Sequence, residues 1–257
     1  IWMIYGNPNA KSESNGNAVF EMFDVQGIVG FWHMDELQWT GAAGEVKDET
    51  GVNHGTAYGG ATTTSDAIYG RAGYFDGIGG YVDCGKDDSL DITDAITVEA
   101  WVNTNSQGEY RKIATKGNAS DSSFYFSQGL GSHKTYFGVR NQDSDVKHAV
   151  YDQYLPIGEW VHLVGTYDGS SVNLYWNGIL VATEPHSGLI YTNNYPVRIS
   201  GYTTGGEIFD GIIDEFRIYN RALTPTEVQI LSQNYMQKMG SYFNVRKYVT
   251  PAPVVIV

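Results

Sequence analysis

The sequence has 257 residues and a formal net charge of −13 at pH 7. Such a charge argues against nucleic acid and anionic membranes as partners, because both require a basic protein surface. With 19 tyrosines, 10 phenylalanines and 31 glycines but only 18% charged residues, the composition predicts aromatic-rich strands joined by tight turns. No stretch approaches the roughly eighteen consecutive apolar residues of a membrane helix, so no membrane insertion is expected within the chain.

The two ends of the chain differ from its middle. Residues 1–24 join an apolar, strand-like start to a loop rich in Gly, Asn and Ser, and residues 241–257 read as extended segments interrupted by Pro. Both ends resemble a small β-domain of unknown function from archaeal and bacterial surface proteins, and the matching residues are Tyr5, Gly6, Asn7, Pro8, Ala10, Ser12, Ser14, Val245, Arg246, Lys247, Tyr248, Pro251 and Pro253. This implies that a central domain, residues 25–240, is inserted into another β-domain, and we expect the sequence to be a piece of a longer protein.

The central domain is predicted to begin with a strand at residues 29–36, VGFWHMDE. Large residues alternate on both of its faces, with Phe31 on one and Trp32 on the other. A strand with two apolar faces lies between two layers, as in a sandwich. The loop after it, residues 44–60, is rich in Asp, Asn and Gly, which favour turns.

Short strand-like runs then follow one another through the middle of the chain. They include YFDGIGGYVDCG at residues 74–85 and ITVEAWVNT at residues 96–104, and later runs recur about every ten to fifteen residues. The tripeptide Trp176-Asn177-Gly178 predicts a tight hairpin turn, and the lone Cys84 is expected to be a small buried residue. This rhythm is typical of a sandwich with many strands.

Only one helix has a clear start in the sequence. Thr224 stands before Pro225, and Glu227 follows three residues after the threonine, which is the pattern of a capping box with proline in the first turn. We therefore expect a helix over residues 225–239 in an otherwise all-β chain.

The last predicted strand, GIIDEFRIYNRAL at residues 211–223, carries an unusual acid. Ile212, Phe216 and Ile218 recur at even positions and predict one buried face, which also holds Asp214. A buried carboxylate must be paired or must bind a cation. Arg217 has the opposite parity, so the sequence leaves open whether Asp214 is paired or is a metal ligand.

Four of these motifs resemble laminin-G-like domains of the concanavalin A-like lectin and glucanase type. They are F-D-G at residues 75–77, Y-V at 81–82, T-V-E-A-W-V at 97–102 and D-E-F-R-I-Y-N-R-A-L at 214–223. The resemblance implies a jelly-roll sandwich of two antiparallel sheets with one short C-terminal helix. It also implies a binding module of an extracellular or cell-surface protein.

A cation site is expected where the first and last strands meet. Asp35, Asp48 and Asp214 are predicted to converge there, and three carboxylates repel one another unless a cation lies between them. The resemblance implies a structural calcium held by these residues with help from Gly51, Asn53 and His54. The alternative is a hydrogen-bonded turn without metal, and zinc is not favoured because the surrounding donors are oxygens.

Sugar-binding residues are sought among the aromatic side chains of the loops, since sugars bind to aromatic faces beside polar groups. The candidates are Trp39, Tyr110, Tyr151, Tyr154, Tyr195 and Tyr202. The loops at residues 141–154 and 189–207 are the preferred places. In a sandwich, however, aromatic residues serve first as core, so each candidate has a purely structural alternative.

Catalysis is not expected. A glycoside hydrolase needs two carboxyl groups facing one sugar bond. The nearest pairs, Asp35 with Glu36 and Asp214 with Glu215, are sequence neighbours, which point to opposite faces of a regular strand. The sequence therefore predicts a non-catalytic module that binds carbohydrate. The alternatives are an adhesion module that assembles surface proteins without binding sugar and, less favoured, a glycoside hydrolase.

Overall fold

The computed structural model describes residues 26–108, 110–130 and 133–233. The segments 1–24 and 241–257, which the sequence assigns to a flanking β-domain, lie outside the described residues. Within the described part no helix combines the length and apolar character needed to cross a membrane.

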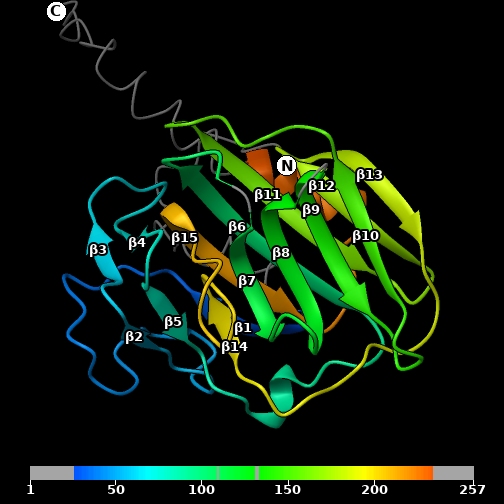
Figure 1. Cartoon of the computed structure of the whole chain (residues 1–257), viewed down its shortest axis with the longest axis horizontal. Coiled ribbons are helices and arrows are strands. Elements are labelled where there is room, and N and C mark those ends of the chain that lie inside the picture. The colour runs from blue at the N-terminus through cyan, green and yellow to red at the C-terminus, as the bar shows by residue number, and fades with distance from the viewer. Residues whose placement is uncertain (1–25, 109, 131–132, 234–257) are drawn as a thin grey trace, which may run out of the picture.

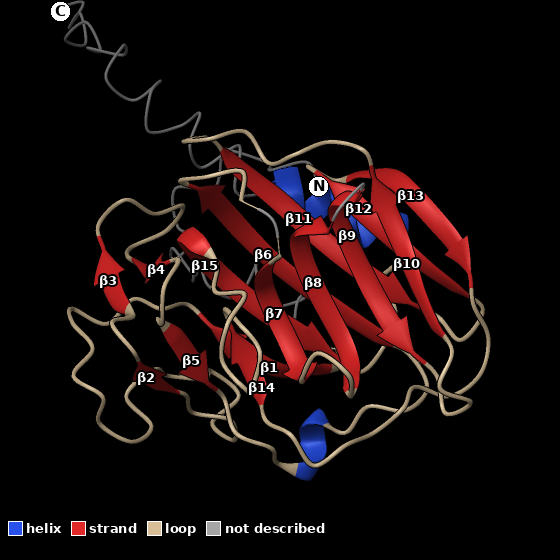
Figure 2. Cartoon of the chain, in the orientation of Figure 1, coloured by secondary structure: helices blue, strands red, loops and turns tan. Residues whose placement is uncertain are grey.

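The strands form two packed sheets, as predicted (Figures 1 and 2). One sheet has eight strands, in the order β13 (Ile179–Pro185), β12 (Ser171–Trp176), β11 (Trp160–Tyr167), β6 (Ile96–Thr104), β15 (Asp210–Tyr219), β4 (Ala72–Asp76) and β3 (Thr62–Thr64), with β1 (Ile28–Trp32) also paired to β15. The other has seven strands, in the order β10 (Val146–Tyr151), β9 (His133–Arg140), β8 (Ser122–Leu130), β7 (Arg111–Gly117), β14 (Val197–Ile199), β5 (Tyr81–Asp83) and β2 (Thr56–Tyr58). These strands pair antiparallel throughout, which confirms the all-β jelly roll.

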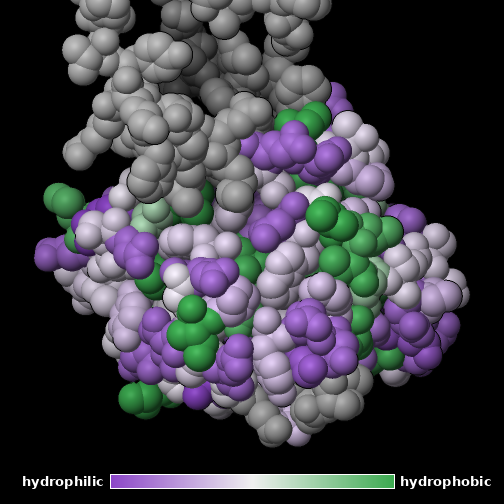
Figure 3. Space-filling model, turned by 90° about the horizontal axis from the view of Figure 1, so that it is seen from above, coloured by the Kyte–Doolittle hydropathy of each residue, from purple (hydrophilic) through white to green (hydrophobic). Residues whose placement is uncertain are grey.

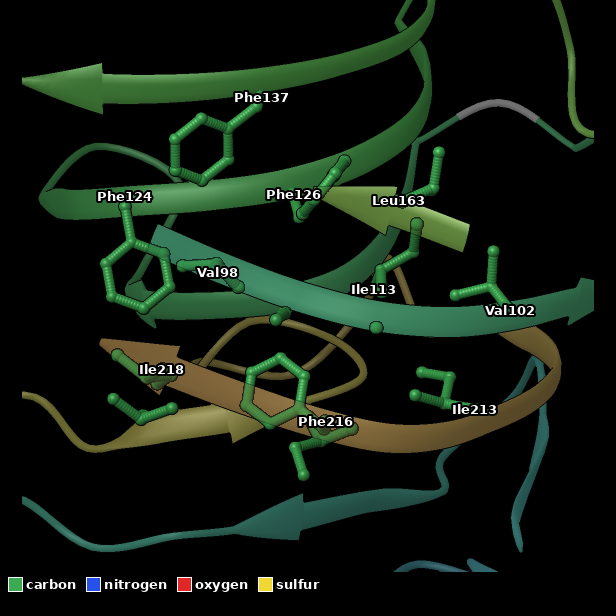
Figure 4. Close-up of a cluster of buried hydrophobic side chains, with 14 of the residues drawn as sticks. Val98, Val102, Ile113, Phe124, Phe126, Phe137, Leu163, Ile213, Phe216 and Ile218 are labelled. Atoms are coloured by element: carbon green, nitrogen blue, oxygen red, sulfur yellow. The ribbon is translucent and has the colours of Figure 1, made fainter. Parts of the chain in front are cut away.

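The hydrophobic core fills the space between the two sheets. The eight-stranded sheet contributes Val98, Val102, Leu163, Ile213, Phe216 and Ile218, and the seven-stranded sheet contributes Ile113, Phe124, Phe126 and Phe137 (Figure 4). Since alternate residues of a strand point to opposite faces, the residues between these positions lie on the outer faces of the sheets. Polar and aromatic side chains such as Tyr125 therefore lie on the outer face of the seven-stranded sheet.

The predicted helix begins where the sequence placed it. Residues 225–233 are helical, and residues 234–239 of the predicted helix lie outside the described part. The Thr224 amide donates to Oε2 of Glu227 at 2.7 Å, and the Glu227 amide donates to Oγ1 of Thr224 at 3.3 Å. The capping box is thus confirmed. A single 3₁₀ turn, Asp88–Leu90, is the other helical element that the structure describes.

The regular alternation predicted for the last strand is wrong, because β15 contains a bulge. Its pairing with β6 shifts register between Asp214 and Arg217, and Glu215 has a φ of 53°. A bulge inserts one extra residue and changes which face the following side chains occupy. Ile213, not Ile212, therefore joins Phe216 and Ile218 in the core.

Candidate functional site

The predicted cation ligand Asp48 lies at the centre of a hydrogen-bonded turn. Its carboxylate is buried and accepts bonds from the amides of Phe31, Thr50, Val52 and Asn53, at distances from 2.8 to 3.2 Å. The hydroxyl of Thr50 donates to it as well. These donors already occupy the oxygen lone pairs that a cation would use. The geometry therefore matches the metal-free alternative for this loop.

Asp35 and Asp214 bind a different segment, residues 68–71. Asp35 Oδ1 accepts from the amide of Arg71 at 2.5 Å. Oδ2 of Asp214 accepts from the amides of Ile68 and Tyr69 at 2.7 and 3.0 Å. Burial, reinforced by the neighbouring charge of Glu215, raises the pKa of Asp214 to about 8. This segment thus links Asp214 of β15 to Asp35, which lies three residues after the end of β1.

The other predicted cation ligands are also engaged by the protein. The Gly51 amide donates to the carbonyl of Asp48, and Nδ1 of His54 accepts from the Asp48 amide. Asn53 Oδ1 and Asp214 Oδ1 are two buried oxygens that find no hydrogen-bond partner among the described residues. In the described part of the chain, however, no three His, Cys, Asp or Glu side chains gather closely enough to hold a metal ion. Calcium binding stays a prediction.

The expectation that Asp214 and Glu215 point to opposite faces is wrong. Asp214 stands opposite Trp101 of β6, and Arg217 stands opposite Glu99. Since residues 99 and 101 share a face of β6, both partners lie on the outer face of the eight-stranded sheet. The bulge brings Glu215 to that face as well, where it binds Arg217. Both carboxyl groups are completely buried, so neither is part of an exposed, sugar-accessible surface.

Two of the predicted ligand-binding aromatics are integrated into the scaffold. Trp39 is buried, packs against Phe75 with tilted rings, and donates from Nε1 to Oε2 of Glu36 at 2.9 Å. Tyr151 packs edge-on against Trp176 at the border of the core.

Two others lie near lysines. The carbonyl of Tyr195 accepts from Lys116 Nζ at 3.0 Å, and the ring centroid of Tyr154 lies 5.5 Å from Nζ of Lys134. The structure does not bring these four aromatic residues together.

The structure does bring Tyr202 to a cluster of side chains around Lys112, which we call the Lys112 cluster: Lys112, Tyr125, Tyr136, His148, Tyr202 and Glu207. It lies on the outer face of the seven-stranded sheet, whose strands β7 to β10 are in front in Figure 1. Nζ of Lys112 lies 5.2, 5.4 and 4.9 Å from the ring centroids of Tyr125, Tyr136 and Tyr202. It donates to the hydroxyl of Tyr136 at 3.0 Å and pairs with Glu207 at 3.0 Å.

Burial shifts the pKa values of the lysine and of the three tyrosines in the cluster. Burial lowers the pKa of Lys112, and the charge of Glu207 opposes this effect. Burial raises the pKa of Tyr136 to about 12 and the pKa values of Tyr125 and Tyr202 still further. The hydroxyl of Tyr125 is hydrogen-bonded to Nε2 of His148. Within the cluster Lys112, Tyr136 and Tyr202 are buried, whereas Tyr125 and His148 are half-buried and reach the surface with a neutral hydroxyl group and aromatic rings.

Strained backbone surrounds this cluster. Tyr110, Ser200 and Glu207 have φ values of 57°, 70° and 55°. Residues other than glycine seldom adopt such angles, and strain of this kind gathers at functional sites. The loop that carries Tyr202 also contains Gly205 and Gly206, both with positive φ. Tyr110, another predicted ligand residue, is 42% exposed at this border.

A second aromatic stack continues the same face toward the far edge of the sheet. Tyr58 and Tyr81 stack with centroids 5.2 Å apart, and the guanidinium of Arg198 lies 3.9 Å from the Tyr81 centroid. Arg198 pairs in register with Thr115 of β7, which in turn pairs with Tyr125 of β8. The face therefore carries aromatic and polar groups from β2 to β10.

The sequence does not point to Lys112, Tyr125 and Tyr136, whereas His148 and Glu207 lie within the preferred ranges 141–154 and 189–207 without being named as candidates. Tyr125 and Tyr136 alternate with the core residues Phe124, Phe126 and Phe137. In a sandwich this alternation assigns them to the outer face. Aromatic residues predicted on an outer face are the sequence feature that could have indicated a binding surface. The sequence candidates are all assigned to loops, although residues 146–151 of the preferred range 141–154 form strand β10.

Comparison with known proteins agrees with this architecture. A family model described as the concanavalin A-like lectin/glucanases superfamily matches residues 76–229, more than half of the chain. Pappalysin-1 from Mus musculus is 32% identical over 178 residues, which cover 62% of this chain and 11% of that protein. Pappalysin-1 from Homo sapiens is 28% identical with the same coverage. The match thus spans a small part of these relatives.

Several solved structures share the fold. Domain 4 of AbnA, an extracellular arabinanase from Geobacillus stearothermophilus solved with arabinotriose, has a TM-score of 0.65 and 22% identity, over 80% of this chain and 98% of that one. The binding domain of Paraclostridial Mosquitocidal Protein 1 has a TM-score of 0.60 and 16% identity, over 81% of this chain and 52% of that one. The binding domain of botulinum neurotoxin serotype G has a TM-score of 0.56 and 16% identity, over 77% and 50%. At these identities the likeness shows the fold.

Proposed function

The chain belongs to the concanavalin A-like lectin/glucanases superfamily, and on this basis we propose that it is an extracellular module that binds carbohydrate without cleaving it. The binding surface is the outer face of the seven-stranded sheet. The observation that carries this proposal is the Lys112 cluster, where three tyrosine rings, a histidine and an ion pair meet under strained loops.

The chemistry of the cluster suits a sugar. Sugar rings pack their C–H faces on aromatic rings, and their hydroxyl groups exchange hydrogen bonds with polar side chains. Tyr125 and His148 are half-buried, so part of each side chain is open to solvent, and the Tyr125 hydroxyl is hydrogen-bonded to Nε2 of His148. That domain 4 of AbnA was solved with arabinotriose supports a short neutral oligosaccharide as the first ligand to test.

A non-catalytic role is supported by the position of the carboxyl groups. Glu207, the acid of the Lys112 cluster, is held by Lys112 at 3.0 Å. A second acid, Asp83, lies on the same face near Arg198 at 3.6 Å. Glu207 is paired with Lys112 and Asp83 with Arg198, whereas a hydrolase needs one protonated acid and one free carboxylate on either side of the sugar bond.

The alternative of an adhesion module without sugar binding would need a broad apolar surface. On the part of the surface that Figure 3 leaves visible, hydrophobic residues form small groups separated by hydrophilic ones. That face therefore gives the assembly alternative little support.

Binding is tested with a glycan array and then by titration calorimetry with arabinotriose and with each glycan that the array identifies. Tyr125→Ala should weaken binding at least about tenfold, because one buried stacking contact is lost. Tyr151→Ala, at a tyrosine that packs on Trp176 away from the cluster, is the matched control and should retain affinity. Failure of the wild-type protein to bind any glycan would contradict the proposal, and so would equal binding by Tyr125→Ala.

A further inference from the structure

We propose that Glu207 is a specificity-determining residue that makes the Lys112 cluster select uncharged saccharides and reject those bearing carboxylate or sulfate groups. This inference rests on the proposed function, and it adds the chemical class of the ligand. It follows from the pairing of Lys112, and of the neighbouring Arg198 and Lys134, with carboxylates of the protein itself.

The charge of the central cation, Lys112, is compensated by Glu207 and is not accessible to a ligand. Lys112 is almost completely buried, and Nζ lies 3.0 Å from Oε2 of Glu207, whose side chain is 28% exposed. The same Nζ donates to the Tyr136 hydroxyl at 3.0 Å, within a cage of three tyrosine rings. An incoming anion would have to displace Glu207 to reach this ammonium group, and would leave a carboxylate beside its own charge.

Two neighbouring cations of the face, Arg198 and Lys134, are also paired with carboxylates. Nε of Arg198 lies 3.6 Å from Oδ2 of Asp83, and Nζ of Lys134 lies 3.1 Å from Oδ1 of Asp152. Arg140 differs from these two, because its Nη2 donates to a neutral group, the carbonyl of Ser120, at 2.9 Å. Lys112, Arg198 and Lys134 therefore add little positive electrostatic potential to the binding surface.

The charge of the whole chain acts in the same direction. A formal net charge of −13 repels an approaching polyanion and lowers its association rate. A neutral sugar meets no such barrier, and it can accept or donate hydrogen bonds at the Tyr125 hydroxyl and His148 without breaking the Lys112–Glu207 pair. Both the Lys112–Glu207 ion pair and the negative net charge of the chain therefore favour neutral sugars over anionic ones.

The wild-type protein provides the first test. Neutral oligosaccharides and their matched uronic acid and sulfated counterparts are printed on one array at low and at physiological ionic strength. We expect binding to neutral members only, with little dependence on salt because no net ion pair forms with the ligand. Equal or stronger binding of the charged counterparts would overturn the inference.

The second test changes the charge of the cluster alone. Glu207→Gln keeps the size of the side chain and releases the charge of Lys112, so affinity for a uronic acid oligosaccharide should rise about tenfold or more. Asp152→Asn removes one negative charge as well, but from a side chain that is 81% exposed beside Lys134, and should produce no such gain. Equal gains in both variants would mean that net charge, and not Glu207, sets the preference.

A third variant guards against loss of folding. The double variant Lys112→Gln/Glu207→Gln removes both charges of the buried pair, so no unpaired ammonium remains. It should show no gain for uronic acids, and a gain in it would overturn the inference. The two proposals fail differently: a wild-type protein that binds no glycan at all contradicts the proposed function, whereas one that binds neutral and acidic glycans alike contradicts only the role of Glu207.

Discussion

Arg217 donates from Nη2 to Oε2 of Glu215 at 2.7 Å, from a position two residues along the same strand. Its other terminal nitrogen donates to Oε1 of Glu99 at 3.0 Å. One guanidinium therefore bridges two fully buried carboxylates on the outer face of the eight-stranded sheet. His33 pairs with Glu215 and His162 with Glu99 at the two ends of this network.

We expect Arg217→Met to lower the free energy of unfolding by about 3–5 kcal/mol, because it leaves buried carboxylates without their central cation. Urea denaturation at pH 7 measures this change. Arg221→Met is the control, since the Arg221–Glu227 pair is partly exposed and should contribute no more than about 1 kcal/mol. A loss below about 1 kcal/mol in Arg217→Met would show that the network does not hold the sheet together.

This network marks the limit of prediction from sequence for the fold. The strands, the two-sheet class and the capped helix follow from alternation, turn residues and the Thr224–Glu227 pattern. The bulge in β15 does not, because Glu215 adopts a left-handed conformation that usually requires Gly or Asn. The bulge lies where β15 pairs with β6 and β1, two strands that are distant in sequence. Parity arguments about Asp214 and Arg217 therefore failed.

The candidate site shows a similar limit. The sequence points to Tyr202, because it is an aromatic residue in a loop with polar neighbours. It does not point to Lys112, because a lysine near the start of a strand is ordinarily exposed, and its burial depends on rings from β8, β9 and the loop at residue 202. Such a cage is built from contacts between distant segments, so it becomes visible only in the folded chain.

Gly138→Ala tests the Lys112 cluster with a single methyl group. A Cβ at Gly138 would lie 2.7 Å from Cδ2 of His148 and 2.8 Å from Cε2 of Tyr125. Both are ends of half-buried side chains that can move, so we expect the two rings to separate. Glycan affinity should fall about threefold to tenfold while the free energy of unfolding changes by about 1 kcal/mol or less. Calorimetric titration and urea denaturation measure the two effects.

Gly165→Ala is the matched control for this substitution. A Cβ at Gly165 would lie 2.2 Å from Cγ of Phe137, in the core between the sheets. Overpacking there should cost about 1–3 kcal/mol of stability and leave glycan affinity unchanged in the folded protein. If Gly138→Ala behaved in the same way, with lower stability and unchanged affinity, the outer face would not be the binding surface.

Calcium removal tests the predicted cation site. A cation that binds only the folded state raises the melting temperature, and a chelator then lowers it. Because Asp48 already accepts four backbone amides and one hydroxyl, we expect the melting temperature to be the same in excess calcium and in excess EDTA. A rise that grows with calcium concentration and disappears in Asp48→Asn would instead establish the site.

The acid stability of the protein should depend on Glu227. Its side-chain bonds to Arg221, at 2.8 and 3.0 Å, and its bonds to Thr224 lower the pKa of this carboxyl from 4.5 to about 2. The folded state therefore binds its proton less readily than the unfolded state does. The resulting stabilisation is complete above pH 4.5 and is lost as the pH falls toward 2.

Glu227→Gln should reduce the free energy of unfolding by about 1–2 kcal/mol at pH 7, from the lost pair and the weakened cap, and should have much less effect at pH 2. Urea denaturation at several pH values gives the difference curve between variant and wild type. In an Arg221→Met background the curve should flatten, because the main cause of the lowered pKa has been removed. A difference that does not change with pH would place the stabilising effect in the cap alone and not in the ionised pair.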